Sequence, residues 1–404
     1  MIKIKANYIL TMNNNFEIIE NGEVIFDKTI IKVGKNLEED ITTIDLGKNS
    51  VLMPGLINTH THLEFSANDT NLRYGDFLNW LNSVILKREN LLNECKNECY
   101  NKAITQMKKS GVVAFGEISS TGLDLEYLKN SELKVVYFNE IIGSNPAAVD
   151  ALYQDFLGRL DNSQKYKTEK FTPAISIHSP YSVHPIVIKK VLQIAKQQNM
   201  IVSAHFMESK AEREWLDNNE GDFKEFFQKN LNQSKAVTTP IEFLSQFEGI
   251  KTHFIHAVWA NKEELEKIAS LKASIAHCPI SNRLLNTGLL NLENIEKLNI
   301  PYSVATDGLS SNYSLNLFKE LRAALLMHTN IEPKKLAKEL LKSVTNSAGE
   351  ILNLNNGIIK EGKFADLISF KLPNDIEIDD IYLQTILHIN EIDKMWINGE
   401  KIDF

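Results

Sequence analysis

The sequence has few cysteines, no long apolar run and no excess of positive charge. Its three cysteines are Cys95, Cys99 and Cys278 in 404 residues. For Cys95 and Cys99, which could share a helix face, we expect core or surface positions rather than a disulfide in so large a chain. No apolar run approaches a membrane span in length, and the first residues lack the pattern of a signal peptide. The formal net charge of −8 argues against binding to nucleic acid. We therefore expect a soluble, cytoplasmic protein without nucleic-acid or membrane partners.

The pattern of apolar and polar residues differs between the two ends of the chain and its middle. Short β-prone runs separated by Asn and Gly turns fill both ends, whereas apolar runs alternate with amphipathic stretches between residues 54 and 352. Counting the run that ends at His60, there are eight apolar runs, the others being 112–118, 134–141, 171–178, 200–206, 251–257, 273–278 and 300–307. Eight β–α units predict an α/β fold with a closed (β/α)8 barrel. The alternative is a doubly wound sheet, but no glycine-rich phosphate fingerprint follows any run.

Histidines gather where these predicted strands end. Eight of the ten histidines lie in or next to the strand ends: His60, His62, His178, His184, His205, His253, His256 and His277. Core packing gives no reason for such a concentration, whereas the active sites of (β/α)8 barrels lie at the C-terminal ends of the strands. The pattern therefore indicates a functional site at this end of the barrel.

His60 and His62 form the first part of a candidate metal site. Residues two apart on a strand point the same way, so both imidazoles can reach one ion. His205 ends the fifth predicted strand and Asp307 the eighth, so three imidazoles and a carboxylate meet at one edge. The alternative is a set of structural histidines with a capping aspartate.

Glu208 follows His205 by three residues, close to the candidate metal without needing to bind it. That position suits general acid–base catalysis on an activated water, and the alternative is an exposed glutamate at the start of a charged helix. His178 and His256 remain as polar groups for a substrate. We expect His253 to be structural, assign no role to His184, and leave His277 either orienting its loop or contacting substrate.

Seven motifs extend the pattern over nearly the whole chain: PGLINTHTH, HSPYSV, HFMES, HAVW, AHCPISN, ATDGLSSNYSLNLF and GIIKEGKFADLI. This ordered set resembles the amidohydrolase superfamily. Within it, the chain is similar to the branch of methylthioadenosine/S-adenosylhomocysteine deaminases, aminodeoxyfutalosine deaminases, guanine deaminases and triazine chlorohydrolases. The resemblance implies a TIM-like barrel over residues 54–352 and a small β-sandwich domain formed by residues 1–53 and 353–404.

The resemblance also implies roles for the strand-end residues. It makes His60, His62, His205 and Asp307 the ligands of one divalent metal ion, with zinc expected and iron or manganese as alternatives. The family's two-metal members carry a bridging lysine where this chain has His178, which implies a single ion. Glu208 matches the proton-shuttling glutamate of the deaminases, His256 the histidine beside the attacking hydroxide, and His178 a substrate-binding histidine. Asp307 would accept the proton of the activated water, and the implied reaction is hydrolytic deamination of an aminopurine.

Residues outside the metal site give the indications of the substrate. Glu89, nine residues after Trp80, falls where nucleoside deaminases of the family bind ribose, and its alternative is a solvated helix glutamate. Asn139 stands where S-adenosylhomocysteine deaminases have an arginine, which argues against that substrate. The phrases HTHLEFS, GDFLNWL and HFMES resemble the 6-amino-6-deoxyfutalosine deaminases of menaquinone biosynthesis. The resemblance then places the aromatic end of that substrate on Trp80, Phe65 or Phe77, and its carboxylate near Arg213 or Arg283.

Two other functions remain open from the sequence. One is a broader methylthioadenosine/S-adenosylhomocysteine or adenosine deaminase, and the other is a non-catalytic scaffold built on the same barrel. The expected partner is a small-molecule aminopurine nucleoside. A homo-oligomer is compatible with the sequence but not indicated by it.

Overall fold

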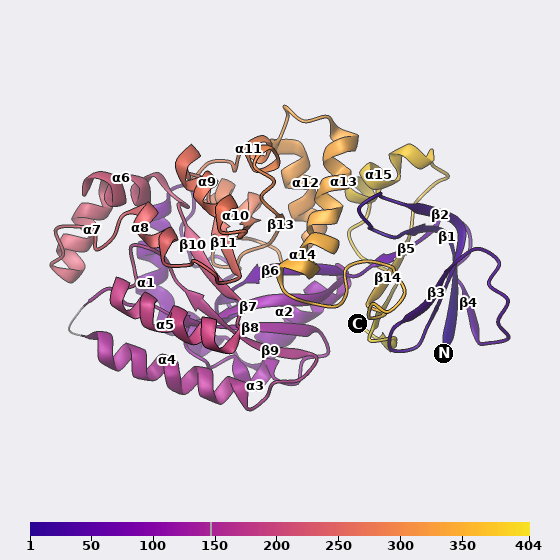
Figure 1. The fold of residues 1–404 in the computed structure, drawn as a ribbon, viewed down its shortest axis with the longest axis horizontal. Helices are drawn as coiled ribbons and strands as arrows, with labels where there is room; N and C mark the ends of the chain where they lie inside the picture. The colour runs from indigo at the N-terminus through magenta and orange to yellow at the C-terminus, as the bar shows by residue number, and fades with distance from the viewer. Residues whose placement is uncertain (146–147) are drawn as a thin grey trace.

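The computed structural model describes residues 1–145 and 148–404. Its central element is a sheet of eight parallel strands in the order β13-β12-β11-β10-β9-β8-β7-β6, curled into a barrel (Figure 1). The strands are β6 (Leu56–Thr61), β7 (Val112–Ser119), β8 (Lys134–Ile141), β9 (Phe171–Ile177), β10 (Val202–Phe206), β11 (Thr252–His256), β12 (Ser274–His277) and β13 (Tyr302–Val304). All eight predicted strands are present.

Side-chain hydrogen bonds join the two ends of this sheet. Asn58 Nδ2 donates to Thr306 Oγ1 at 2.7 Å, and the hydroxyls of Thr59 and Ser303 lie 2.7 Å apart. The chain therefore forms a nearly closed barrel, and the predicted (β/α)8 fold is confirmed.

Helices surround the barrel and connect its strands. α5 shows how the sequence specifies one. His184 caps its N-terminus by accepting a hydrogen bond from Ile186 N–H, Pro185 occupies the first turn, and Asn199 ends it in the left-handed conformation. Its buried residues recur at helical spacing. The helices are α1 (Phe77–Glu94), α2 (Asn97–Lys109), α3 (Leu125–Leu128), α4 (Val149–Gln164), α5 (Pro185–Gln198), α6 (Lys210–Asn218), α7 (Asp222–Leu231), α8 (Pro240–Ser245), α9 (Lys262–Ser270), α10 (Pro279–Leu284), α11 (Leu292–Lys297), α12 (Leu317–Met327), α13 (Pro333–Ser343), α14 (Asn346–Ile351) and α15 (Ile381–His388), with 3-10 turns η1 (Leu63–Phe65) and η3 (Ile378–Asp380).

A second, mixed sheet is made from both ends of the chain and lies to one side of the barrel (Figure 1). β5 pairs with β1 on one side and with β14 on the other, so the N- and C-terminal segments share one ladder. The tight turn between β15 and β16 is formed by Asn398 and Gly399, both with positive φ, as the sequence NGE predicts. The strands are β1 (Ile2–Leu10), β2 (Ile18–Phe26), β3 (Ile30–Gly34), β4 (Thr43–Asp45), β5 (Ser50–Pro54), β14 (Leu367–Lys371), β15 (Lys394–Ile397) and β16 (Glu400–Ile402). The expected β domain from both chain ends is confirmed.

A buried ion pair joins this β domain to the barrel. Lys134 Nζ at the start of β8 lies 2.5 Å from Asp366 Oδ2, and the exposed fractions of the two side chains are 3% and 0%. Asp366 also accepts hydrogen bonds of 2.7 Å from Asn356 Nδ2 and from the backbone N–H of Asn398. Both oxygens of this carboxylate thus have partners inside the protein.

No helix within the described residues combines the length and the apolar character that crossing a bilayer would require.

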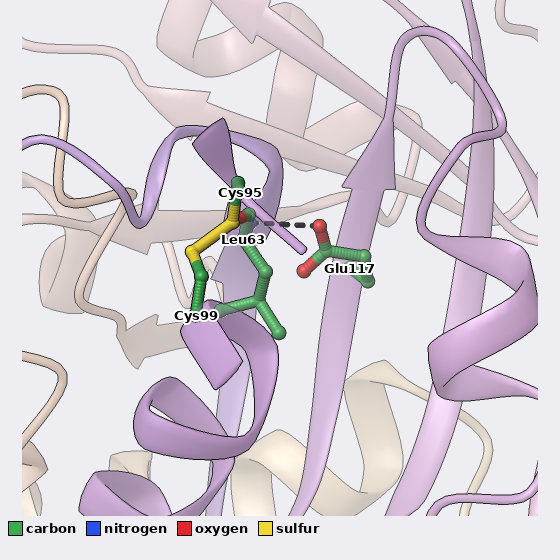
Figure 2. Close-up of a disulfide and its surroundings, with 4 residues drawn as sticks. All are labelled: Leu63, Cys95, Cys99 and Glu117. Carbon is green, nitrogen blue, oxygen red and sulfur yellow. Dashed lines mark hydrogen bonds between the residues drawn. A yellow bond between two sulfur atoms is a disulfide. The ribbon is translucent and has the colours of Figure 1, made fainter. Parts of the chain in front are cut away.

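The expectation that Cys95 and Cys99 are not bonded is wrong. Figure 2 shows them joined in a disulfide between the end of α1 and the start of α2. The expectation rested on chain size, whereas local geometry decides the outcome. Cys95 leaves the helix with an extended backbone, and the following turn returns the chain so that the two Cα atoms lie 5.1 Å apart. Cys278 is free and buried.

Candidate active site

Three strand ends bring His60, His62, His205 and Asp307 to one point. His60 and His62 come from β6, His205 from β10, and Asp307 follows β13. The Nε2 atoms of His60 and His62 are 3.1 Å apart, and they lie 3.4 and 3.5 Å from Asp307 Oδ1. Ring nitrogens of the three histidines all lie within 4.8 Å of one another. Three imidazoles and one carboxylate at these separations fit a divalent transition metal ion.

Hydrogen bonds fix the orientation of two histidine rings. His205 Nδ1 lies 2.7 Å from the backbone oxygen of His178 and donates to it, which leaves a lone pair on Nε2 facing the other imidazoles. His256 Nδ1 donates to Asn282 Oδ1 at 2.9 Å in the same way. Both rings therefore present an unprotonated Nε2 to the site.

Asp307 is held in an unusual backbone conformation. Its φ is +57°, in the left-handed region that costs free energy for a residue with a side chain. Oδ1 accepts from Gly308 N–H at 2.9 Å, and Oδ2 accepts from the hydroxyls of Ser281 and Ser311 at 2.8 Å each. A Cβ atom on Gly308 would lie only 2.7 Å from His62 Cβ, so glycine is required for Asp307 to approach the histidine pair.

Glu208 is buried beside this group, with 6% of its surface exposed. Its Oε1 lies 3.5 Å from His256 Nε2. The backbone N–H groups of Met207 and Glu208 donate to the carboxylate of Glu212 on α6 at 3.0 and 2.9 Å, which positions the chain after β10. Burial, with the nearby charge of Asp307, raises the pKa of Glu208 well above its usual range. Glu208 is thus not an exposed surface residue, and it can carry a proton into the cavity.

Burial lowers the pKa of two of these histidines, His62 and His256. It lowers the pKa of His62 to about 3, helped by repulsion from His60, and it lowers the pKa of His256 to about 4 against the attraction of Asp307. Burial alone would raise the pKa of Asp307, but the hydrogen bond and charge of His60 hold it well below its usual range. Neutral imidazoles and an ionised carboxylate are the forms that bind a metal.

His62, His205, Glu208, His256 and Asp307 line a cavity of about 420 Å³ that also receives several of the side chains assigned to substrate from the sequence. His178, Phe65 and Trp80 lie on its wall. The indole N–H of Trp80 donates to the backbone oxygen of Ser310 at 2.7 Å, which fixes the orientation of the ring. The rest of the wall is mostly apolar and is lined by Phe77, Leu81, Val84, Ile85, Leu152, Tyr181, Phe226, Phe227 and Leu231.

Glu89 does not lie in the cavity. It is exposed on α1, and its neighbour Arg88 lines the wall instead. The reason is helix geometry: nine residues after Trp80 is two and a half turns, which places Glu89 on the opposite face, whereas eight residues restores the face. The helical spacing of Phe77, Trp80 and Arg88 was available in the sequence, so periodicity could have found this arginine.

The two arginines proposed for a substrate carboxylate also lie elsewhere. Arg213 donates to both carboxylate oxygens of Glu264 at 2.9 and 2.7 Å and pairs with Asp217. Arg283 ends α10, and neither arginine is among the described residues of the cavity wall.

Two further histidines have structural partners. His253 is bonded to Ser274 and Thr59 in the barrel interior, at 2.8 and 3.1 Å. His277 Nε2 lies 3.1 Å from Nε2 of His328 and is fully buried. His277 thus takes up a position behind the cavity wall rather than on it.

Glu140 and Ser120 are among the polar wall residues that the sequence motifs did not single out. Glu140 is the next-to-last residue of β8 and Ser120 follows β7, and both line the cavity. The strand-end rule was applied to histidines and to one aspartate, and it applies equally to Glu140.

Known proteins resemble this chain over nearly its whole length. Residues 51–402 match the Amidohydrolase family. An aminodeoxyfutalosine deaminase from a Nitratiruptor species is 48% identical over 98% of both chains. An adenosine deaminase from Helicobacter pylori is 35% identical over 99% of both. The crystal structure of Helicobacter pylori aminofutalosine deaminase in complex with methylthio-coformycin superimposes with a TM-score of 0.96 at 35% identity, covering 100% of each chain.

Proposed function

The chain belongs to the amidohydrolase family and hydrolyses a C–N bond, and on this premise we propose its substrate: 6-amino-6-deoxyfutalosine, deaminated to futalosine in the cytoplasm as a step of menaquinone biosynthesis. The observation that carries the proposal is the pairing of a complete His3Asp set with a buried, proton-bearing Glu208 in a cavity lined by aromatic and aliphatic side chains. The 48% identity to an aminodeoxyfutalosine deaminase supports the choice of substrate.

We infer that His60, His62, His205 and Asp307 hold one divalent ion, with zinc expected and iron or manganese as alternatives. The fit rests on the donor set, because three imidazoles and a carboxylate converge, and the bond from His205 Nδ1 leaves His205 Nε2 free to face the ion. A divalent ion in such a site supplies Lewis-acid activation of a water molecule near neutral pH.

The chain's own residues supply the proton transfers. Glu208 gives its proton to a ring nitrogen of the aminopurine, which makes the amine-bearing carbon electrophilic. Asp307 Oδ accepts one proton of the attacking water and would pass it to the exocyclic amine, so that the C–N bond breaks and ammonia leaves. The remaining hydroxyl proton returns to Glu208 as the carbon becomes the 6-oxo group. His256 Nδ1 donates to Asn282, so Nε2 of the neutral ring carries no proton. His256 Nε2 can therefore accept a hydrogen bond from the attacking water and orient the lone pair of the water oxygen.

The cavity favours a substrate with a large apolar end. Beyond Trp80 and Phe65 the wall is formed by side chains of α1 and α7 that offer little hydrogen bonding. An aromatic ketone extending from the ribose would bury apolar surface there at about 25 cal/mol per Å². Free adenine would leave this part of the cavity unfilled.

Steady-state kinetics on a panel of substrates tests the proposal. We expect kcat/KM for 6-amino-6-deoxyfutalosine to exceed that for 5′-methylthioadenosine, S-adenosylhomocysteine, adenosine and guanine. A higher value for any of the other compounds would reject the assignment. The second candidate is a methylthioadenosine or adenosine deaminase, which the 35% identity to an adenosine deaminase favours, and the same panel separates it.

A further inference from the structure

The end of β8 carries a buried carboxyl group that the deamination chemistry does not use. Glu140 is 2% exposed and lines the cavity. Its Oε1 is buried, and no hydrogen-bond partner for this atom occurs within residues 1–145 and 148–404. One of its oxygens lies within 4.8 Å of ring nitrogens of His178 and His205. A buried acceptor without a donor costs free energy, so a ligand that donates to it is expected.

A cationic donor lines the wall of the same cavity. Arg88 is presented by α1, and its Nη2 donates to Ser120 Oγ at 3.0 Å. Ser120 is itself fixed, because its hydroxyl and its backbone N–H both donate to Glu64, at 2.6 and 3.1 Å. Among the described residues this is the one hydrogen bond of the guanidinium, which has five N–H donors. Arg88 is thus oriented by one bond and retains donors for a ligand.

We propose that Glu140 and Arg88 form the subsite that recognises the two ribose hydroxyls of the nucleoside, with Glu140 accepting from a hydroxyl group and Arg88 donating to a hydroxyl oxygen. The inference rests on the proposed function and deepens it, since it assigns the sugar contacts of the same cavity. It also moves the sugar contact from Glu89, on the exposed face of α1, to a residue of a barrel strand.

The position of the pair suits a sugar rather than the base or the apolar end. Glu140 adjoins His178 and the proposed metal ligand His205, whereas the aromatic and aliphatic part of the wall is formed largely by α1 and α7. A cis-diol carries two donors and two acceptors, and a carboxyl and a guanidinium on the wall of one cavity satisfy both kinds. A second metal ion at Glu140, His178 and His205 is disfavoured because His205 Nε2 already faces His60 and His62.

The test measures discrimination between sugars. Metal-loaded wild-type protein and the variants Glu140→Gln, Glu140→Ala, Arg88→Met and Glu89→Gln are assayed on 5′-methylthioadenosine and on its 2′-deoxy and 3′-deoxy analogues. Wild type should prefer the ribonucleoside in kcat/KM by about 10- to 100-fold, as expected for loss of a hydrogen bond to a charged group. In Glu140→Ala this preference should fall to within about threefold, and Glu140→Gln and Arg88→Met should be intermediate. Melting temperature and metal content, measured alongside, separate loss of recognition from loss of fold.

Three outcomes would overturn the inference. The first is an equal kcat/KM of the wild-type protein for the ribonucleoside and the two deoxynucleosides. This outcome does not depend on the folding of any variant. The second is a Glu140→Ala protein that slows on all three substrates by the same factor. The third is collapse of the preference in Glu89→Gln alone, which would assign the sugar to Glu89. Failure of the proposed function is a separate result, namely poor turnover of 6-amino-6-deoxyfutalosine by wild type.

Discussion

Glu208 separates proton transfer from metal binding, because it lies next to the ligand set without belonging to it. The substitution Glu208→Gln keeps the size of the side chain and removes its carboxyl group. We expect kcat to fall by about two orders of magnitude or more, with metal content unchanged. Kinetics and elemental analysis of the same preparation check this. Glu214→Gln, on the outer face of α6 in an ion pair with Lys210, is the matched control. A kcat within about threefold of wild type would remove Glu208 from the mechanism.

Glu117 has no contact with the cavity, yet it holds the chain on both sides of His62. Its carboxylate accepts from Leu63 N–H at 2.8 Å and from the Thr61 hydroxyl at 2.7 Å (Figure 2 shows the contact with Leu63). We therefore expect Glu117→Ala to weaken metal binding by about 10- to 100-fold, as loss of an orienting partner does.

Competition with a chelator measures the metal affinity of Glu117→Ala directly. Asp124→Asn is the control, since Asp124 is equally buried in the same acidic cluster but accepts from Ser119 and Tyr137 rather than from β6. Equal loss of affinity in both variants would indicate a general packing effect and contradict the specific role of Glu117.

The convergence of the four proposed metal ligands and the place of several side chains on the cavity wall could be predicted from the sequence, whereas Glu89 was misplaced and Glu140 was missed. His60, His62, His205 and Asp307 follow strands, and strand ends of a parallel barrel converge whatever the loops do. Glu89 does not reach the cavity wall. The inference from motif spacing did not take into account which face of α1 Glu89 occupies. Glu140 escaped notice because the strand-end rule was applied to histidines and to one aspartate only. The lack of a partner for its Oε1 among the described residues is a property of three-dimensional packing.

At the level of elements, α1 forms part of the cavity wall, and a specific contact holds each of its two ends. Its N-terminus is capped by Asp76, whose side chain accepts from Asn79 N–H, and its C-terminal end is tied to α2 by the disulfide of Cys95 and Cys99. The sequence predicted the helices well because their apolar spacing is regular, but the crosslink depends on a turn whose shape no periodicity encodes.

Cys99→Ser should lower the free energy of unfolding by about 2 kcal/mol under oxidising conditions, since the crosslink closes only a short loop of the unfolded chain. Denaturant unfolding of wild type and variant, with and without a reductant, measures this. Reductant should bring wild type to the value of the variant and leave the variant unchanged. A reductant-independent wild type would show that the bond contributes nothing to stability.

At the level of the whole molecule, the Lys134–Asp366 pair links the barrel to the β domain. Burial lowers the pKa of Lys134, and the attraction and hydrogen bond of Asp366 oppose this change. Lys134→Met would leave that carboxylate buried and unpaired, and we expect unfolding free energy to fall by about 3–5 kcal/mol.

The exposed pair of Lys48 and Asp375 provides the comparison for this prediction. Their side chains are 76% and 69% exposed and lie 2.8 Å apart. Lys48→Met should cost less than about 1 kcal/mol. Chemical denaturation of both variants in one buffer checks the difference, and similar losses would mean that burial does not govern the strength of these pairs.

The shared ladder of β5 and β14 has a consequence for the order in which the protein is made. During translation, β1 to β5 leave the ribosome first, but Pro54 can find its partner Leu367 only after the entire barrel has been synthesised. Until then β5 presents an unpaired edge, which is the kind of surface that recruits other chains. Completion of the β domain is therefore a late assembly step, and a nascent chain that stalls before β14 would carry an open, aggregation-prone sheet edge.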